Sequence, residues 1–335
     1  MKKVQIILSL IISACFIYFV FQNIDFSQVR EILMDINYVL IVPAVVVQLA
    51  SYWVRSMRWA FMLRSIKRIK SAKLFPIICI SYMANNVLPL RIGEFVRAFL
   101  VGKKERLSKT GAFSTILLER IYDGLTLLLF LGATAILFPF PAWVKRIGFV
   151  TAIVFCIALL FVIGLVIFKN FTLNLIKKST SIFGKKISEK LNNILEQFVI
   201  GLDVIKDKKS LIPIAFFSLV IWMMEGFLFF SIAQAFDYSS TIYLALFVLV
   251  VVNLGIMIPS SPGYVGTFEY FCTKALGVFN VTKESALSYA LVLRIFQYIP
   301  ITVLGFFFLL KEGISLSQMV KQEQDVTINS GEKIV

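Results

Sequence analysis

The chain has no histidine among its 335 residues and only four cysteines. Without histidine there can be no Ser-His-Asp triad, no histidine general base and no histidine-ligated zinc or haem. The cysteines lie in apolar runs without paired spacing, which favours small core or lipid-facing residues over disulfides and metal ligands. They are Cys15, Cys79, Cys156 and Cys272. We therefore expect no cofactor and no metal site.

Acidic residues are also scarce: 19 Asp and Glu stand against 34 Lys and Arg, a formal net charge of +15. The basic residues gather in loops between apolar segments, which is the positive-inside pattern of membrane proteins. The charge therefore indicates membrane lipids with anionic headgroups as partners, and no nucleic acid. A homo-oligomer and a separate lipid-modifying enzyme remain open as further partners.

Apolar residues make up 59% of the chain, and the mean hydropathy is +0.87. Soluble domains seldom exceed about 50% apolar residues, and several runs here approach the ~20 residues of a membrane span. We expect an all-α polytopic membrane protein with about seven full spans and two re-entrant helical hairpins. The first apolar run, 4–21, is interpreted as a retained helix rather than a signal peptide. The expected location is the cytoplasmic membrane of a prokaryote, with both termini in the cytoplasm.

The expected organisation is one membrane domain followed by a polar tail. Its parts are the membrane domain 1–311, a first repeat at about 38–138, a basic amphipathic cytoplasmic segment at about 169–209, a second repeat at about 211–311, and a cytoplasmic tail at 312–335.

Two regions break the helical pattern inside apolar sequence. The first carries Asn86, Pro89 and Gly93 between basic clusters at both of its ends, which predicts a hairpin entering from the cytoplasm. The second carries Pro262, Gly263 and Gly266 with few basic residues after it, which predicts a hairpin entering from outside. Such a pair indicates an inverted-topology repeat whose tips meet near the midplane.

Charged side chains cluster around both breaks, and charge at membrane depth usually marks a pathway or a site. The spacing from Glu94 to Arg120 resembles that from Glu269 to Arg294, as expected for a repeat. The candidate headgroup-binding residues are Arg91, Glu94, Arg97, Glu119, Arg120, Asp123, Glu269 and Arg294. The arginines and the open N-termini of the returning half-helices would hold a phosphate or other anion. Alternatively, the charges pair with one another and only lock the helices together.

Arg55 and Arg58 share a helix face at the end of the apolar run 38–62. They are expected to reach the membrane interface, where contact with lipid headgroups is a second interpretation.

Three motifs together resemble a known family. They are Asn86-x-x-Pro89-x-Arg91-x-Gly93-Glu94-x-x-Arg97, Glu119-Arg120-x-x-Asp123, and Pro259-x-x-Pro262-Gly263-x-x-Gly266-x-x-Glu269. They look like the lysylphosphatidylglycerol synthase transmembrane family, the flippase-like membrane domain of the multiple peptide resistance factor. The resemblance covers about residues 4–311. It implies movement of aminoacylated phosphatidylglycerol between leaflets, and it makes the motif residues the candidate site.

The synthase activity in the family name belongs to a separate soluble domain that is not recognisable in this sequence. We therefore expect a stand-alone member that moves an anionic or aminoacylated phospholipid, or a lipid-linked precursor, through a polar midplane cavity. Enzyme activity is uncertain and less expected than transport. The alternatives are a membrane-embedded headgroup transferase and a small-solute secondary transporter, and no ATP-binding loop GxxxxGK[ST] is present.

Overall fold

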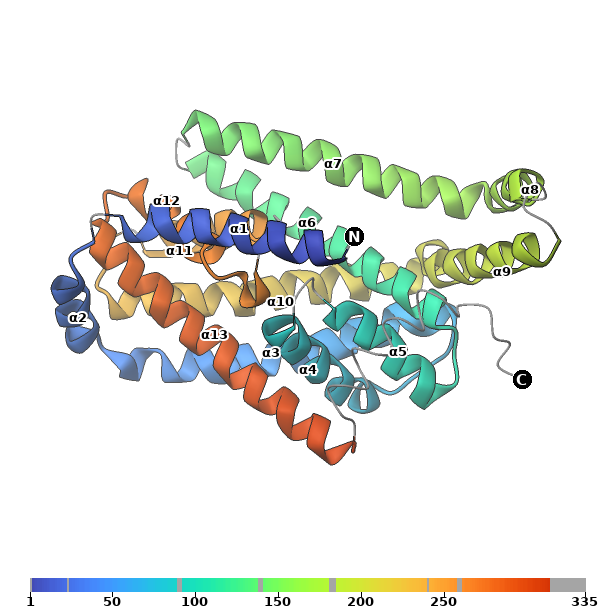
Figure 1. Cartoon of the computed structure of the whole chain (residues 1–335), viewed down its shortest axis with the longest axis horizontal. Coiled ribbons are helices and arrows are strands. Elements are labelled where there is room, and N and C mark those ends of the chain that lie inside the picture. Colours follow the sequence, from blue (N-terminus) through green and yellow to red (C-terminus); the bar gives the residue numbers. More distant parts are fainter. Residues whose placement is uncertain are drawn as a thin grey trace.

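The computed structural model describes residues 2–22, 24–88, 92–137, 141–180, 185–239, 241–257 and 261–313. Within these residues the regular structure is entirely helical (Figure 1). The first half contains α1 (Lys2–Phe21), α2 (Phe26–Asp35), α3 (Val42–Met62), α4 (Ser71–Val87), α5 (Gly93–Glu105) and α6 (Lys109–Leu137). The second half contains α7 (Ala142–Ile167), α8 (Lys169–Thr180), α9 (Lys185–Leu202), α10 (Lys208–Ala235), α11 (Thr241–Gly255), α12 (Thr267–Gly277) and α13 (Lys283–Lys311). Short 3₁₀ turns flank α3 and α10, and one, η6 (Pro262–Tyr264), precedes α12.

Four helical stretches in the described part of the chain are long and apolar enough to cross a membrane. They are the stretch Tyr38–Ser65 around α3, and α7, α10 and α13. Helix α6 has 29 residues and carries three charged residues in its middle. The fold class predicted from the sequence, an all-α polytopic membrane protein, is confirmed.

Two helical hairpins form where the sequence breaks its helical pattern. Helix α4 packs against α5, and α11 packs against α12. The returning helices have 13 and 11 residues, about 20 and 16 Å of helix, which is less than the ~30 Å hydrocarbon core. The two tips meet: a Cβ built on Gly263 would lie 3.3 Å from the carbonyl oxygen of Asn86. The end of α4 in the first hairpin therefore lies against η6 in the second.

Glycine is needed at both tips for different reasons. A Cβ at Gly93 would collide with the carbonyl oxygen of Ser81 and lie 2.6 Å from Oδ1 of Asn85, so this glycine lets α5 approach α4 closely. Gly263 and Gly266 have φ of +65° and +89°, where a side chain is strained. The second tip therefore depends on backbone conformation, and the first depends on close packing.

The packing of the two halves follows one pattern. Helices α3, α4, α5 and α6 each pack on the next one along the chain, and so do α10, α11, α12 and α13. Between the halves, α3 packs on α10, α4 on α13, and α6 on α11. Exchanging the first set of four helices for the second leaves this list of contacts unchanged.

The segment predicted as cytoplasmic and amphipathic, 169–209, folds into α8, α9 and a short 3₁₀ turn before α10. Helix α9 packs along α6, with Val199 and Leu202 buried. Helix α10 begins at an N-cap, Asp207, whose carboxylate accepts from the backbone N–H of Lys209 at 3.1 Å and from Oγ of Ser210 at 2.6 Å. The Ser210 hydrogen bond holds the pKa of Asp207 below its usual range.

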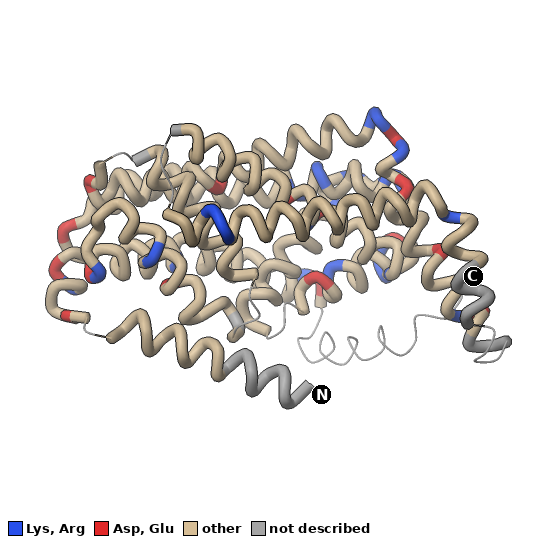
Figure 2. The backbone as a smooth tube through the Cα atoms, turned by 90° about the horizontal axis from the view of Figure 1, so that it is seen from above, with Lys and Arg blue, Asp and Glu red and all other residues tan. Residues whose placement is uncertain are grey.

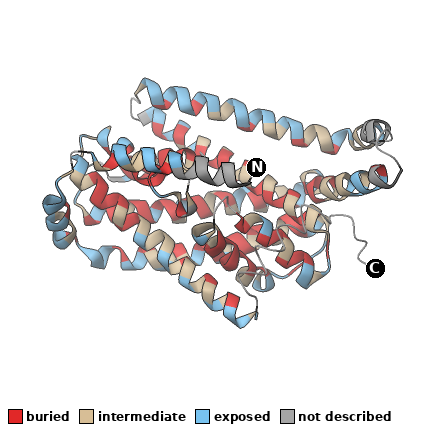
Figure 3. Cartoon of the chain, in the orientation of Figure 1, coloured by how far each residue is buried: buried red, intermediate tan, exposed pale blue. Residues whose placement is uncertain are grey.

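Helix α7 lies along one edge of the bundle and exposes most of its length (Figures 1 and 3). Its exposed residues are largely apolar, among them Phe149, Val154, Ile157 and Phe161. Large apolar patches of this kind mark contact with another apolar phase, which for a membrane protein is lipid. Figure 2 shows charged residues at both ends of the bundle and also within its body. The interior charges form the candidate site.

Candidate functional site

Helix α3 carries a buried polar stripe at helical spacing. Its members face the interior of the bundle rather than the membrane interface, and they are Gln48, Ser51, Tyr52, Arg55, Ser56 and Arg58. Arg55 is only 4% exposed and Arg58 is 0% exposed. The expectation that these two arginines reach the membrane interface is therefore wrong. They point inward because carboxylates on α6 and α10 pair with them.

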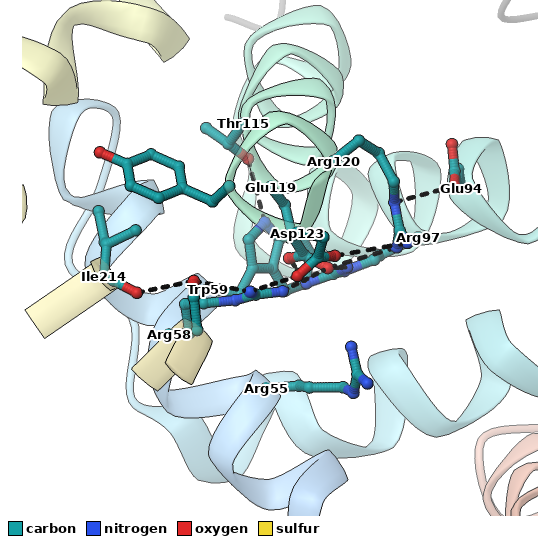
Figure 4. Close-up of polar contacts among 12 residues, drawn as sticks. Arg55, Arg58, Trp59, Glu94, Arg97, Thr115, Glu119, Arg120, Asp123 and Ile214 are labelled. Carbon is teal, nitrogen blue, oxygen red and sulfur yellow. Dashed lines mark hydrogen bonds and ion pairs between the residues drawn. The ribbon is translucent and has the colours of Figure 1, made fainter. Parts of the chain in front are cut away.

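Arg58 lies at the centre of an interior ion network (Figure 4). Its Nη1 lies 2.6 Å from Oδ1 of Asp123 and 2.9 Å from Oγ of Ser218, and its Nη2 lies 3.3 Å from Oε1 of Glu119. Glu119 also accepts two hydrogen bonds from Arg97, at 3.0 and 2.9 Å. The network thus joins α3, α5, α6 and α10.

Aromatic side chains complete the surroundings of this network. The guanidinium of Arg97 lies 3.9 Å from the ring centroid of Trp59, a cation–π distance. The indole Nε1 of Trp59 donates to Thr115 at 3.0 Å, and that of Trp222 donates to Asp123 at 3.1 Å. Arg58, Arg97 and Glu119 have side chains that are at most 1% exposed. These three residues are therefore paired with one another inside the bundle, and a guanidinium with two hydrogen bonds to one carboxylate is the geometry that such a pair prefers.

A cavity of about 250 Å³ lies between the two halves, next to the network. It is lined by charged and amide side chains from both halves together with aromatic rings. Its charged lining residues are Arg55, Glu94, Arg120, Asp123 and Glu225. Asn86 of the first tip and Tyr264 of the second also line it. A polar space enclosed by half-helices is the setting in which irregular backbone is tolerated at membrane depth.

Arg120 is the network arginine that reaches this cavity most openly. Its side chain is 34% exposed, and its Nε lies 3.2 Å from Oε1 of Glu94, which is 17% exposed. Figure 4 shows Arg120 extending from α6 toward Glu94 on α5. Its other contacts are longer, 3.4 Å to Glu119 and 3.6 Å to Asp123. Arg120 therefore keeps a guanidinium face available beside a single close carboxylate.

The second half holds a matching pair. Nε of Arg294 lies 2.5 Å from Oε1 of Glu269. The same guanidinium donates to the carbonyl oxygens of Gly263 at 2.7 Å and Tyr264 at 3.2 Å. Its Nη atoms are thus already committed to the backbone of the second tip. This pair holds the hairpin turn, whereas the Arg120 and Glu94 pair lines the cavity.

The N-termini of the half-helices are capped by the protein itself. The backbone N–H of Gly93 donates to Oδ1 of Asn85 at 2.9 Å, and that of Gly266 donates to Oε2 of Glu269 at 2.8 Å. The sequence predicted unpaired N–H groups at both positions, and for these two groups that prediction is wrong.

Two functional candidates were missed by the site prediction. Glu225 on α10 accepts from Nη2 of Arg55 at 2.5 Å and from Nε2 of Gln297 at 2.7 Å. Tyr82 accepts from Nη1 of Arg55 at 2.9 Å. A lone carboxylate in the middle of a 28-residue apolar helix was the signal for Glu225.

Two predicted site residues, Pro89 and Arg91, lie outside the described residues, as does the side chain of Pro262. Of the remaining candidates, the structure brings Glu94, Arg97, Glu119, Arg120 and Asp123 together in one cluster with Arg55 and Arg58. Glu269 and Arg294 form the second pair at the other hairpin.

The chain matches a known protein family and resembles several named proteins. The family model described as the lysylphosphatidylglycerol synthase TM region matches residues 6–305. A protein named glycosyltransferase AglD from Haloferax volcanii is 24% identical over 97% of this chain and 57% of the relative. The chain therefore spans little more than half the length of that relative. A UPF0104 membrane protein from Methanocaldococcus jannaschii is 22% identical over 91% of this chain and 95% of the relative. No solved structure matches the chain significantly.

Proposed function

Because the chain belongs to the lysylphosphatidylglycerol synthase transmembrane family, we propose that it is a lipid translocase. In this proposal the headgroup of an anionic or aminoacylated phospholipid, or of a lipid-linked precursor, crosses through the 250 Å³ cavity. The hydrocarbon chains stay in the membrane. Four residues of the first two family motifs, Asn86, Glu94, Arg120 and Asp123, line this cavity, which supports the proposal.

One observation carries it: Arg120 faces the cavity with a third of its side chain exposed, and its nearest carboxylate, Glu94 at 3.2 Å, is itself partly exposed. An arriving phosphate offers two oxygens in the geometry that a guanidinium fork prefers. It can replace Glu94 without breaking the bidentate pair of Arg97 and Glu119 behind it. The network therefore stays in place while one arginine exchanges partners.

Charge balance explains why an exchange is needed. The described network holds four arginines, Arg55, Arg58, Arg97 and Arg120, and four carboxylates, Glu94, Glu119, Asp123 and Glu225. Among the described residues the two kinds of charge are equal in number, so an anion that displaces a carboxylate or brings a cation keeps this balance. Glu94 is the most exposed carboxylate of the four, so it is the one that moves.

The matching helix contacts support an inverted repeat as the basis of transport. Hairpins that enter from opposite faces would place the cavity at the midplane, and rocking of one half against the other would open it to each side in turn. The contact between Gly263 and Asn86 is then the point at which the halves separate.

The experiment is a reconstitution in liposomes with headgroup-labelled phosphatidylglycerol and an impermeant quencher. A translocase exposes the inner-leaflet label to the quencher and leaves the mass of the lipid unchanged. A new lipid mass would instead indicate headgroup transfer, the reaction class suggested by the name of the Haloferax relative. No movement of anionic, zwitterionic, aminoacylated or sugar-linked lipid would overturn the proposal and favour a solute carrier.

A further inference from the structure

A second cavity, of about 190 Å³, lies between α6, α7, α11 and α12. Its walls are apolar or aromatic and include no charged residue. They include Leu131, Trp143, Val144, Gly148, Leu254 and Phe271. We call this cavity the apolar slot.

The apolar slot opens on the exposed side of α7. Its deep wall is buried, with Val250 0% and Val144 3% exposed, whereas Trp143 and Ile147 at its edge are 38% and 40% exposed. Helix α7 packs closely on α6, and the apolar slot separates it from α11. A lipid chain can therefore enter from the membrane without crossing a polar surface.

The apolar slot adjoins the charged cavity along α6 and α11. Leu127 lines the charged cavity, and Leu131, one helical turn further along α6, lines the apolar slot. On α11, Gly255 belongs to the apolar slot and Ile256, the next residue, to the charged cavity. The charged cavity and the apolar slot therefore lie next to each other along α6 and at the end of α11.

Two cations stand at the outer end of the apolar slot. Lys145 and Arg146 are exposed in the first turn of α7, next to Trp143. By helix geometry they project to either side of the face formed by residues 143, 144, 147 and 148. An indole at the slot edge with two flanking cations has the composition of an interface that binds anionic headgroups.

We propose that the apolar slot binds one hydrocarbon chain of an anionic phospholipid, whose phosphate is held by Lys145 and Arg146. Apart from the indole of Trp143 at its edge, the lining side chains of the compartment include no polar or charged group that would hold a polar solute. This site does not depend on the proposed translocation, because a bound lipid at this position needs no transport.

The test compares two glycines on the same helix. Gly148 lines the apolar slot, and a Cβ there would meet only the end of the Leu131 side chain, which can rotate away. Gly164 has nothing within 4 Å of its Cβ position. Gly148→Leu fills the apolar slot and Gly164→Leu does not, while both make the same change in helix propensity.

The probe is phosphatidylglycerol with a diazirine in one acyl chain, in nanodiscs with the whole chain. We expect crosslinks in residues 142–148 and 250–255, reduced about tenfold in Gly148→Leu and unchanged in Gly164→Leu. Ile147→Trp at the exposed edge should give the same loss and guards against a folding defect in Gly148→Leu.

A second arm tests the charge. Replacing Lys145 and Arg146 together by glutamine should lower the crosslink yield of phosphatidylglycerol about tenfold and leave that of phosphatidylcholine unchanged. Equal crosslinking of wild type and Gly148→Leu, or equal labelling of both lipids by the wild type, would overturn the proposal. Failure of headgroup movement in liposomes would leave these crosslinks unaffected, so the two proposals can fail separately.

Discussion

At the scale of single residues, the interior arginines divide into two roles by exposure and partner geometry. Arg97 makes two hydrogen bonds to Glu119, lies over Trp59 and is 1% exposed. Arg120 is 34% exposed and has one close carboxylate. The same residue type is therefore buried in a two-bond pair in one position and partly exposed beside the cavity in the other.

Removing the locking arginine should destabilise the protein. Arg97→Ala leaves the buried Glu119 without the guanidinium that donates two hydrogen bonds to it, which should lower the free energy of unfolding by about 3–5 kcal/mol. Arg97→Lys should recover only part of this stability, because an ammonium group cannot reproduce both hydrogen bonds. The measurement is thermal unfolding in detergent. Arg30→Ala on the exposed face of α2 is the control and should change stability by less than about 0.5 kcal/mol. If Arg97→Ala unfolds at the same temperature as the wild type, the network does not hold the helices together.

The sequence singled out most charged residues of the interior network, but not the ion pairs that Arg55 and Arg58 make. Arg55 and Arg58 stood at the end of an apolar run, followed by further basic residues, so the local pattern indicated an interface. Their burial depends on tertiary structure. The carboxylates that pair with Arg55 and Arg58 lie on helices far along the chain and reach them only in the packed bundle; they are Glu119, Asp123 and Glu225. A stripe of polar residues on α3 was the local sign of burial.

At the scale of elements, the two hairpins were predictable because glycine, proline and asparagine interrupt apolar runs that are otherwise long enough to continue. The returning helices begin at or just after these interruptions, α5 at Gly93 and α12 at Thr267. Their capping was not predictable, because Asn85 and Glu269 could equally have faced the cavity.

The first hairpin should be sensitive to a single methyl group. Gly93→Ala places a Cβ against the backbone of Ser81 and Oδ1 of Asn85, and such overpacking costs about 1–3 kcal/mol. Gly132→Ala on α6 is the matched control, because nothing lies within 4 Å of its Cβ position, and it should stabilise by up to ~1 kcal/mol. Detergent melting curves compare the two. If Gly93→Ala and Gly132→Ala change the melting temperature equally and in the same direction, α4 and α5 are not closely packed at Gly93.

At the scale of the whole molecule, the matching contacts of the two halves are the strongest reason to expect an inverted repeat. The sequence alone suggested it from two breaks in apolar runs with different basic flanks and from a recurring spacing between a glutamate and an arginine. The structure adds the pairs themselves, Glu94 with Arg120 and Glu269 with Arg294. The sidedness of the two hairpins remains a prediction based on the distribution of Lys and Arg.

Cysteine labelling tests this sidedness. In a variant without the four native cysteines, Lys103→Cys near the end of α5 should resist an impermeant maleimide in intact cells, and Gly277→Cys at the end of α12 should react. Both positions are exposed, so access depends on the side of the membrane. Permeabilised cells serve as the control, in which both should react. Labelling of both positions from the same side would rule out inverted hairpins.

The central claim is that a lipid headgroup passes Arg120. The measurement is the rate at which an impermeant quencher gains access to inner-leaflet, headgroup-labelled phosphatidylglycerol in liposomes, compared among wild type, Arg120→Ala and Arg30→Ala. We expect Arg120→Ala to lower the rate about 10- to 100-fold, because the headgroup loses a hydrogen bond to a charged group. Arg30→Ala should match the wild type, and both variants should remain folded. Equal rates for wild type and Arg120→Ala would contradict it.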